Sequence, residues 1–490
     1  MKLILAASAV FGVWLGWRSL GWPLIHDAPL MHYVAWLIAQ GAVPYRDVFD
    51  MNMPGVYLIH WAVLSTVGAG DLAWRLVDLA WLAGICGLLF VFGKGTGDRL
   101  AAAAGAILFA LYHLSGGAWR VGQRDFLLCL FLLGGALGVA RAIERGAALQ
   151  PLVVAGLLLG AGMTVKPNAG IYWLMCAGTA AWGAWREKRS LALAAGVVIA
   201  AGLLVPGLVF GWLAWLGGLN SFHAIMFGYV VPLYSHVGRI QLGQAISWYR
   251  NGPALWSLLS VIGFLGLLGP TPPGATTRRM LALLGVGYGW LHFSLQGKGW
   301  EYHLYPLALF ICALVPFAMT RVASRSGFTS SLRRGVALAV FVATVVTLGA
   351  KGVDAVDAGW VAEKSRRVAA LSRDLGPLLR PGDRVQVLDV TEGGLHALFK
   401  LGVRQPTRFL YDFHFFHDQD DPRIKLLQGE LVLGIQSERP RAIVVMRDTW
   451  NRAGYERIQE IPGLTSLLDR AYTLAVEGDG YRIYAKRADS

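Results

Sequence analysis

The stretch that decides the fold class of this chain is LALAAGVVIAAGLLVPGLVFGWLAWL, residues 191–216, which contains no charged residue. A helix needs about 20 apolar residues to cross the hydrocarbon core of a bilayer, so this stretch is long enough to do so. The composition of the whole chain agrees, because 55% of its 490 residues are hydrophobic and only 15% are charged. Soluble domains carry about 25% charged residues. We therefore expect the membrane to be the solvent for most of the chain.

Other apolar stretches extend this pattern to about eleven predicted spans of a mostly α-helical bundle. They lie near residues 3–22, 72–93, 100–114, 125–143, 151–165, 168–184, 190–216, 253–269, 280–296, 302–320 and 335–350. With the N-terminus inside, the basic clusters fall on the cytoplasmic side, as the positive-inside rule requires. The net charge of +14 fits such loops, and no nucleic-acid motif accompanies it, so we expect no nucleic-acid partner. The odd number of spans places the C-terminus outside.

Two segments differ from the spans. In loop 23–71 apolar residues recur at helical spacing around Leu30, Val34 and Leu37, which predicts a helix in the plane of the interface, with Asp27 as its N-cap. After residue 350 the sequence becomes mixed and charged. It predicts an amphipathic helix at 361–379 and strands at 384–390, 408–411 and 441–446. The expected organisation is therefore a membrane domain at 1–350, with interfacial helices in loop 23–71, and a soluble extracytoplasmic α/β domain at 351–490.

Three motifs resemble a known family. They are IHDAPLMHY with GAVPYRDVFDMNMPG at 25–33 and 41–55, GAGMTVKP at 160–167 and EYHLYP at 301–306. They resemble the first outer loop, the glycine-rich span ending in Lys, and the late aromatic-Pro segment of C-superfamily (GT-C) membrane glycosyltransferases. The similarity is greatest to bacterial relatives of protein O-mannosyltransferases and of the lipid A aminoarabinose transferase. Many relatives carry paired acidic residues where this chain has His26 and Asp27.

The resemblance implies an enzyme that transfers a sugar, with inversion, from a polyprenyl-phosphate donor to an acceptor at the outer face of the bacterial inner membrane. The acceptor would be a glycan, a lipid or a protein. Asp27 is the expected catalytic base, because a carboxylate can take the acceptor proton. The leaving phosphate needs cations, for which the candidates are Lys166, Arg124, Lys298 and His303. Candidates for a second acid or for substrate binding are Asp47, Asp50, Asp125, His26, Tyr33, Tyr302 and Tyr305. We expect no obligatory cofactor; a divalent cation remains an alternative, with unknown ligands.

Plainer interpretations exist for each candidate. Asp27 and Asp125 sit where helix N-caps are expected, and Asp47 and Asp50 lie in turn-forming sequence. Arg124, Lys298 and His303 would also serve as interfacial anchors. Loop 217–252 is a candidate for sugar binding, or its aromatic residues simply lie at the membrane interface. The His/Asp-rich stretch 412–421 is a candidate for metal binding, or it is simply a solvated acidic loop.

Two functions of other classes compete with the transferase. One is a transporter or flippase of a lipid-linked sugar, although the sequence shows neither repeated halves nor broken midplane helices. The other is a non-catalytic scaffold for envelope assembly. The sugar and the acceptor depend on side chains that folding brings together, so the motifs do not specify them.

Overall fold

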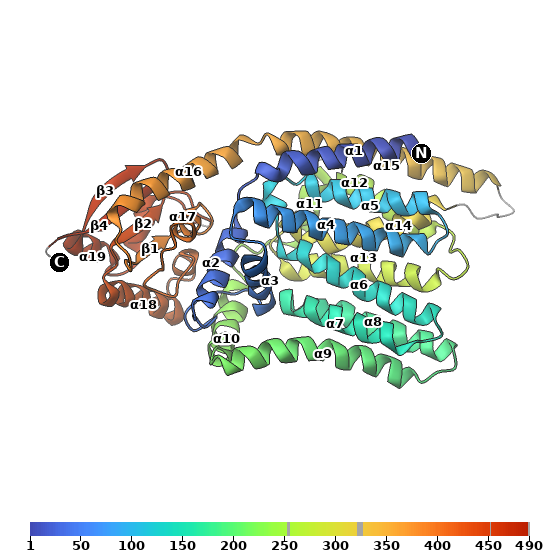
Figure 1. Cartoon of the computed structure of the whole chain (residues 1–490), viewed down its shortest axis with the longest axis horizontal. Coiled ribbons are helices and arrows are strands. Elements are labelled where there is room, and N and C mark those ends of the chain that lie inside the picture. The colour runs from blue at the N-terminus through green and yellow to red at the C-terminus, as the bar shows by residue number, and fades with distance from the viewer. Residues whose placement is uncertain (252–254, 321–326, 451, 489–490) are drawn as a thin grey trace. The chain divides into compact units, whose positions relative to one another are not determined.

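The computed structural model describes residues 1–251, 255–320, 327–450 and 452–488. Most of these residues are helical (Figure 1). The chain forms two compact units, each assembled from three segments. Unit 1 contains Met1–Trp22, Leu72–Val209 and Arg239–Asp357. Unit 2 contains Pro23–Asp71, Phe210–Gly238 and Ala358–Ser490.

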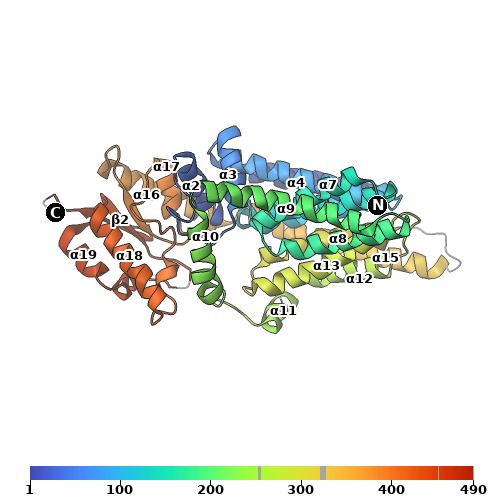
Figure 2. The same ribbon diagram turned by 90° about the horizontal axis from the view of Figure 1, so that it is seen from below.

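Unit 1 is a bundle whose helices run alongside one another (Figures 1 and 2). Its main helices are α1 (Lys2–Arg18), α4 (Asp71–Lys94), α5 (Arg99–Leu114), α6 (Arg124–Glu144), α7 (Leu149–Val165), α8 (Ala169–Arg186), α9 (Leu191–Trp215), α12 (Leu255–Leu268), α13 (Thr276–Gln296), α14 (Tyr305–Met319) and α15 (Gly327–Val356). Shorter elements are η1 (Ser19–Gly21), η2 (Ala118–Arg120), α11 (Leu242–Asn251) and η4 (Glu301–Leu304). Each of the predicted spans coincides with one of the main helices, so the predicted fold class is confirmed.

The described helices include six segments that are long and apolar enough to cross a membrane. α14 lies at the centre of the bundle, since all of its residues are buried. α9, in contrast, is mostly exposed. Only 22% of its most apolar segment is buried, and the side chains of Leu203, Leu204 and Leu208 are more than half exposed. Large exposed apolar side chains on a helix of this length face lipid. The protein is therefore a multi-pass membrane protein.

Glycine permits a close helix contact in the bundle, between α7 and α9. A Cβ added at Gly160 would lie 2.3 Å from the carbonyl oxygen of Gly202. Small residues let backbones approach in this way within membranes, where packing rather than the hydrophobic effect holds helices together. The contact fixes α7, and α7 ends at Val165, directly before Lys166.

Unit 2 is an α/β unit. Its helices are α2 (Asp27–Ala39), α3 (Pro54–Thr66), α10 (Leu219–Ile225), the π-helical η3 (Met226–Tyr234), α16 (Gly359–Leu375), α17 (Gly394–Leu401), α18 (Pro422–Glu438) and α19 (Leu464–Ala471), with short turns η5 (Gly376–Leu378), η6 (Phe413–Phe415) and η7 (Tyr455–Glu460). They pack around a four-stranded sheet of order β1-β2-β4-β3, with β1 (Val385–Leu388), β2 (Ala442–Met446), β3 (Tyr472–Gly478) and β4 (Tyr481–Lys486). β1 and β2 are parallel, and β4 is antiparallel to both of its neighbours.

The predicted strands at 384–390 and 441–446 are confirmed as β1 and β2, and the amphipathic helix at 361–379 as α16. The predicted strand at 408–411 is wrong. That segment makes only a single bridge, Phe409 to Phe49, because it borders loop 1 rather than the sheet. β3 and β4 were not predicted from the sequence.

Loop 1 belongs to the same compact unit as the C-terminal α/β segment. The hydroxyl of Tyr33 on α2 donates to the carbonyl of Val403 (3.0 Å) and accepts from the amide of Gln405 (2.9 Å). The predicted division at residue 350 follows the order of the chain. The compact units instead group residues 23–71 and 210–238 with residues 358–490.

A buried ionic cluster as candidate active site

An ion pair inside unit 1 joins three helices. Asp125, in the first turn of α6, is fully buried. Its Oδ2 lies 3.3 Å from Nζ of Lys166, the C-cap residue of α7. Its Oδ1 lies 2.5 Å from Nε2 of His292 on α13. Buried charges persist only when they are paired and hydrogen-bonded, and Asp125 meets both conditions.

A second set of contacts fixes the protonation pattern of His292. Its Nδ1 lies 3.0 Å from the amide nitrogen of Asn168 and 3.1 Å from the hydroxyl of Tyr288. The Asn168 amide donates, so Nδ1 accepts and Nε2 carries the hydrogen that is donated to Asp125. The imidazole is therefore held as one neutral tautomer and in one orientation.

Two further basic side chains, those of His303 and Arg124, lie near the ion pair of Asp125 and Lys166. His303 in η4 is buried, its ring centre is 6.5 Å from that of His292, and it lies within electrostatic range of Asp125, Lys166 and Arg124. Its Nδ1 makes no hydrogen bond to any described residue. We call Asp125, Lys166, His292, His303 and Arg124 the Asp125 cluster. Its permanent cations are Lys166 and Arg124.

Lys298 follows α13, the helix that carries His292. Burial, together with the charge of Arg239, lowers the pKa of its ammonium to about 8. The four cations predicted to hold a phosphate thus all lie in unit 1. Three of them, Lys166, Arg124 and His303, gather around Asp125.

The interpretation of Asp125 as an N-cap is wrong. Gln123 occupies the cap position of α6, and the Asp125 carboxylate turns away from the helix end toward Lys166 and His292. The sequence does contain a signal for His292, although the list of candidates omitted it. A polar, titratable residue inside an apolar span is expensive and needs a partner.

The same signal marks a second buried network in unit 1. Arg75 and Asp78 on α4 form an ion pair, and Asp78 Oδ2 lies 3.0 Å from Nε2 of His113. Nδ1 of His113 is 2.7 Å from the hydroxyl of Tyr305. Tyr305, a predicted substrate-binding residue, is therefore engaged inside the bundle. Tyr302, another, stacks edge-on against His303 with ring centres 4.6 Å apart.

Unit 2 holds the remaining candidates. Asp27 is the first residue of α2 and is partly exposed. The cap position belongs to His26, whose φ is +53°, so Asp27 is not the N-cap that the sequence predicts. His26 packs against the ring of Trp360, and burial followed by the charge of Lys364 lowers the pKa of its imidazole well below the usual value. A carboxylate in the first turn of a helix is favoured by the helix dipole, so Asp27 occupies a favourable position on α2.

Asp47 and Asp50 have local partners in loop 1. Asp47 pairs with Arg46 at 2.8 Å and accepts a hydrogen bond from the amide of Val43. Asp50 is fully buried and accepts hydrogen bonds from the side chains of Asn52 and Tyr57. These contacts fit the interpretation of both as residues that shape the loop.

Two other polar clusters of unit 2 have partners within the unit. The hydroxyl of Tyr229 lies 2.7 Å from Nδ1 of His414 and 2.8 Å from Nε2 of His417, and Asp412 pairs with Arg457 at 2.8 Å. Over the described residues, no group of three or more His, Cys, Asp or Glu side chains is arranged to hold a metal ion.

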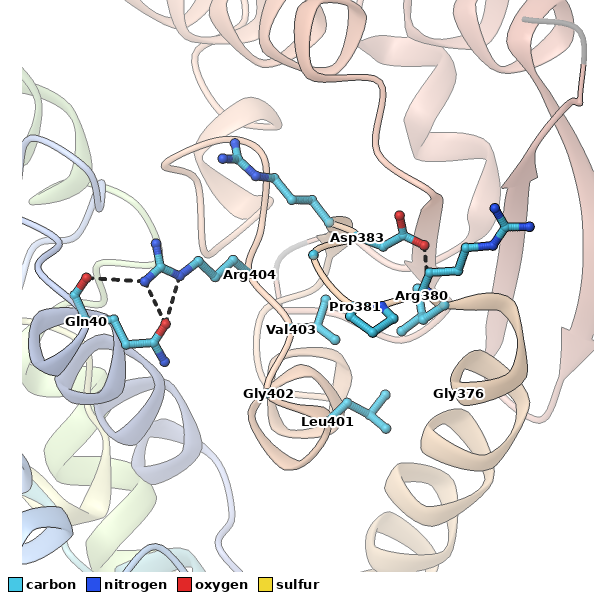
Figure 3. Close-up of a pocket in the computed structure, with 12 residues that line it drawn as sticks. Gln40, Gly376, Arg380, Pro381, Asp383, Leu401, Gly402, Val403 and Arg404 are labelled. Carbon is cyan, nitrogen blue, oxygen red and sulfur yellow. Dashed lines mark hydrogen bonds between the residues drawn. The ribbon is translucent and has the colours of Figure 1, made fainter.

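A polar hollow of about 470 Å³ lies in unit 2 between α2, the end of α16 and the end of α17 (Figure 3). The guanidinium of Arg404 donates to the side chain and the backbone carbonyl of Gln40, and Asp383 accepts from the amide of Arg380. A neighbouring hollow of about 520 Å³ shares Gln40, Arg384 and Arg404. Together they form a polar groove on this unit.

Comparison with known proteins places this geometry in a family of folds. No protein-family model and no curated protein sequence matches the chain. Among solved structures, ArnT from Cupriavidus metallidurans bound to undecaprenyl phosphate matches 99% of this chain and 98% of its own, with a TM-score of 0.59 and 14% identity. The oligosaccharyltransferase AglB from Archaeoglobus fulgidus, in complex with an inhibitory peptide and a dolichol-phosphate, matches 99% of this chain and 74% of its own, with a TM-score of 0.51 and 10% identity.

The chain shares its overall fold with ArnT and AglB. The resemblance stated from the loop 1, Lys166 and Tyr302 motifs is thus confirmed at the level of the fold, over essentially the whole chain. Because the identities are low, the residues of the site must be argued from this chain's own contacts.

Proposed function

We propose that the protein is an inverting glycosyltransferase that takes a sugar from a polyprenyl-phosphate donor at the outer face of the inner membrane. The observation that carries this proposal is the full-length likeness to ArnT, whose structure holds undecaprenyl phosphate. The acceptor is a hydroxyl or an amine on a glycan, a lipid or a protein. The donor and membrane lipids are the expected partners.

The Asp125 cluster is assigned to the donor phosphate. Negative charge develops on the phosphate as its bond to the anomeric carbon breaks, and cations fixed in a site of low dielectric stabilise that charge without reorganising. Lys166, Arg124 and His303 supply positive charge and a free ring nitrogen around one point of unit 1. Asp125 keeps Lys166 in position and lowers the energy of its burial while the site is empty of donor.

Asp27 is assigned the role of the base. The acceptor oxygen or nitrogen attacks the anomeric carbon, its proton passes to the Asp27 carboxylate, and the phosphate departs with the bonding electrons. Attack opposite to the leaving phosphate inverts the anomeric configuration. The partly exposed position of Asp27 in the first turn of α2 allows an acceptor to reach it. Asp50 is fully buried, which makes it a weaker candidate, and Asp47 is held by Arg46 and the amide of Val43 in loop 1.

A binding experiment tests the phosphate site. Lys166→Met combined with Asp125→Asn removes both charges of the pair, so no buried charge is left uncompensated. Arg75→Met combined with Asp78→Asn is the matched control, because it removes the other buried ion pair of unit 1. We expect the first double variant to lose retention of polyprenyl phosphate in native mass spectrometry while the control keeps it. Equal retention by both would remove the Asp125 cluster from the proposal.

A further inference from the structure

Three arginines lie at one end of unit 1, where α12 and α14 end and α13 and α15 begin. They are Arg279 on α13 and Arg333 and Arg334 on α15. Arg333 lies within electrostatic range of both others. We call these residues the Arg279 triad. The positive-inside bias assigns this end of the bundle to the cytoplasmic side.

The triad has only neutral partners among the described residues. Arg279 donates to the hydroxyl of Thr271 at 2.5 Å and to the carbonyl of Leu267. Arg333 and Arg334 each donate to a carbonyl at the end of α14, at 3.1 Å. The adjacent Arg278 is different, because it forms an ion pair with Glu144 at 2.6 Å. The charge of the triad is thus not balanced by any carboxylate in the part of the chain that the structure describes.

Binding to helix ends explains part of this arrangement. Cations are favoured beside the last carbonyls of a helix, where the macrodipole is negative. Each guanidinium has five N–H groups, however, and only one or two are used here. The Nε of Arg333 is buried and makes no hydrogen bond to a described residue. Three like charges held together in this way favour the binding of an anion.

An apolar hollow of about 450 Å³ adjoins the triad. Arg279 and Thr271 form its polar part, and Met175, Met280, Leu283 and Leu284 form most of the remainder. One charged end and an apolar wall fit a molecule with an anionic head and a hydrocarbon chain. Basic pockets between spans on the cytoplasmic side bind the head groups of anionic lipids.

We propose that the Arg279 triad binds the phosphate of an anionic glycerophospholipid, whose acyl chain occupies the adjoining hollow. The bidentate geometry of the guanidinium suits a phosphate, and three arginines can surround a phosphodiester while still capping α12 and α14. This site is separate from the Asp125 cluster, and it serves lipid binding irrespective of the reaction that the protein catalyses.

Native mass spectrometry of the full chain tests the proposal, with phosphatidylglycerol, phosphatidylcholine and undecaprenyl phosphate as probes. The variant carries Arg279→Gln, Arg333→Gln and Arg334→Gln. The matched control carries Arg186→Gln, Lys188→Gln and Arg189→Gln. It removes three exposed cations from the end of α8 and the loop that follows it, which is also predicted to be cytoplasmic. Thermal unfolding without added lipid shows whether each variant is folded.

We expect the parent chain to retain phosphatidylglycerol in preference to phosphatidylcholine. The triad variant should bind phosphatidylglycerol about 100-fold more weakly, since each basic residue near an anionic lipid contributes roughly a fivefold effect. The control should bind as the parent does. Equal loss in both variants would show general attraction and overturn the proposal, as would equal retention of the two phospholipids. Triad-dependent binding of undecaprenyl phosphate alone would overturn the assignment to a glycerophospholipid.

Discussion

The ion pair between Asp125 and Lys166 provides the sharpest prediction about stability. At 3.3 Å and an effective dielectric constant of 20, the attraction is about 5 kcal/mol. Asp125→Asn keeps an oxygen for His292 but leaves the ammonium of Lys166 without its counter-charge. Breaking one side of a buried pair costs about 3–5 kcal/mol. Lys166→Met should cost a similar amount, because it leaves the Asp125 carboxylate buried without the ammonium that pairs with it.

The double variant distinguishes this account from simple loss of packing. With both charges removed, no uncompensated charge remains, so the combined loss should be at least 2 kcal/mol smaller than the sum of the single losses. Equilibrium unfolding in mixed detergent micelles measures all four proteins of the cycle. Losses that add to within about 0.5 kcal/mol would refute the reasoning, because independent sites behave in that way.

Three other predictions follow from the same structure. Asp27→Asn should fold and bind donor lipid but transfer sugar about 100- to 10,000-fold more slowly, as measured by product formation. Asp47→Asn should stay near the parental rate. Near-parental transfer by Asp27→Asn would show that Asp27 is not the base. Burial lowers the pKa of His32 from 6.5 to about 4, so the stability that its neutral form contributes is complete above pH 6.5 and falls by about 3 kcal/mol as the pH drops to 4. His32→Gln should flatten that part of the profile, and an unchanged slope would show that other groups titrate. A reporter active only in the cytoplasm should be silent when fused after the last residue, and a bright signal would reverse the predicted topology.

Hydropathy predicts the spans well because the requirement is local. Each span needs apolar side chains of its own along its whole length and backbone hydrogen bonds within its own helix. The positions of the spans can therefore be predicted without knowledge of the fold. Lys166 lies in a short turn between two spans, where a lone cation needs an anionic partner. The sequence could not identify that partner, because Asp125 and His292 come from α6 and α13, and only packing brings them together.

The soluble part was harder to predict for the same reason. β1 and β2 are buried along their whole length and were recognised, since buried parallel strands have mostly apolar sequences. β3 is exposed at most positions and lacks that run. Asp479 and Gly480, which has φ of +85°, form a two-residue hairpin signal between β3 and β4 that would have predicted the pair.

Transfer itself tests the central claim most directly. The full chain is reconstituted in liposomes with membrane extract from its source and with polyprenyl-phosphate-linked sugars, and the lipids are followed by mass spectrometry. The account predicts that the donor mass declines while bare polyprenyl phosphate accumulates, and that Asp27→Asn abolishes the conversion. Donor lipids that remain intact with the parent chain, or conversion that proceeds equally with Asp27→Asn, would contradict it.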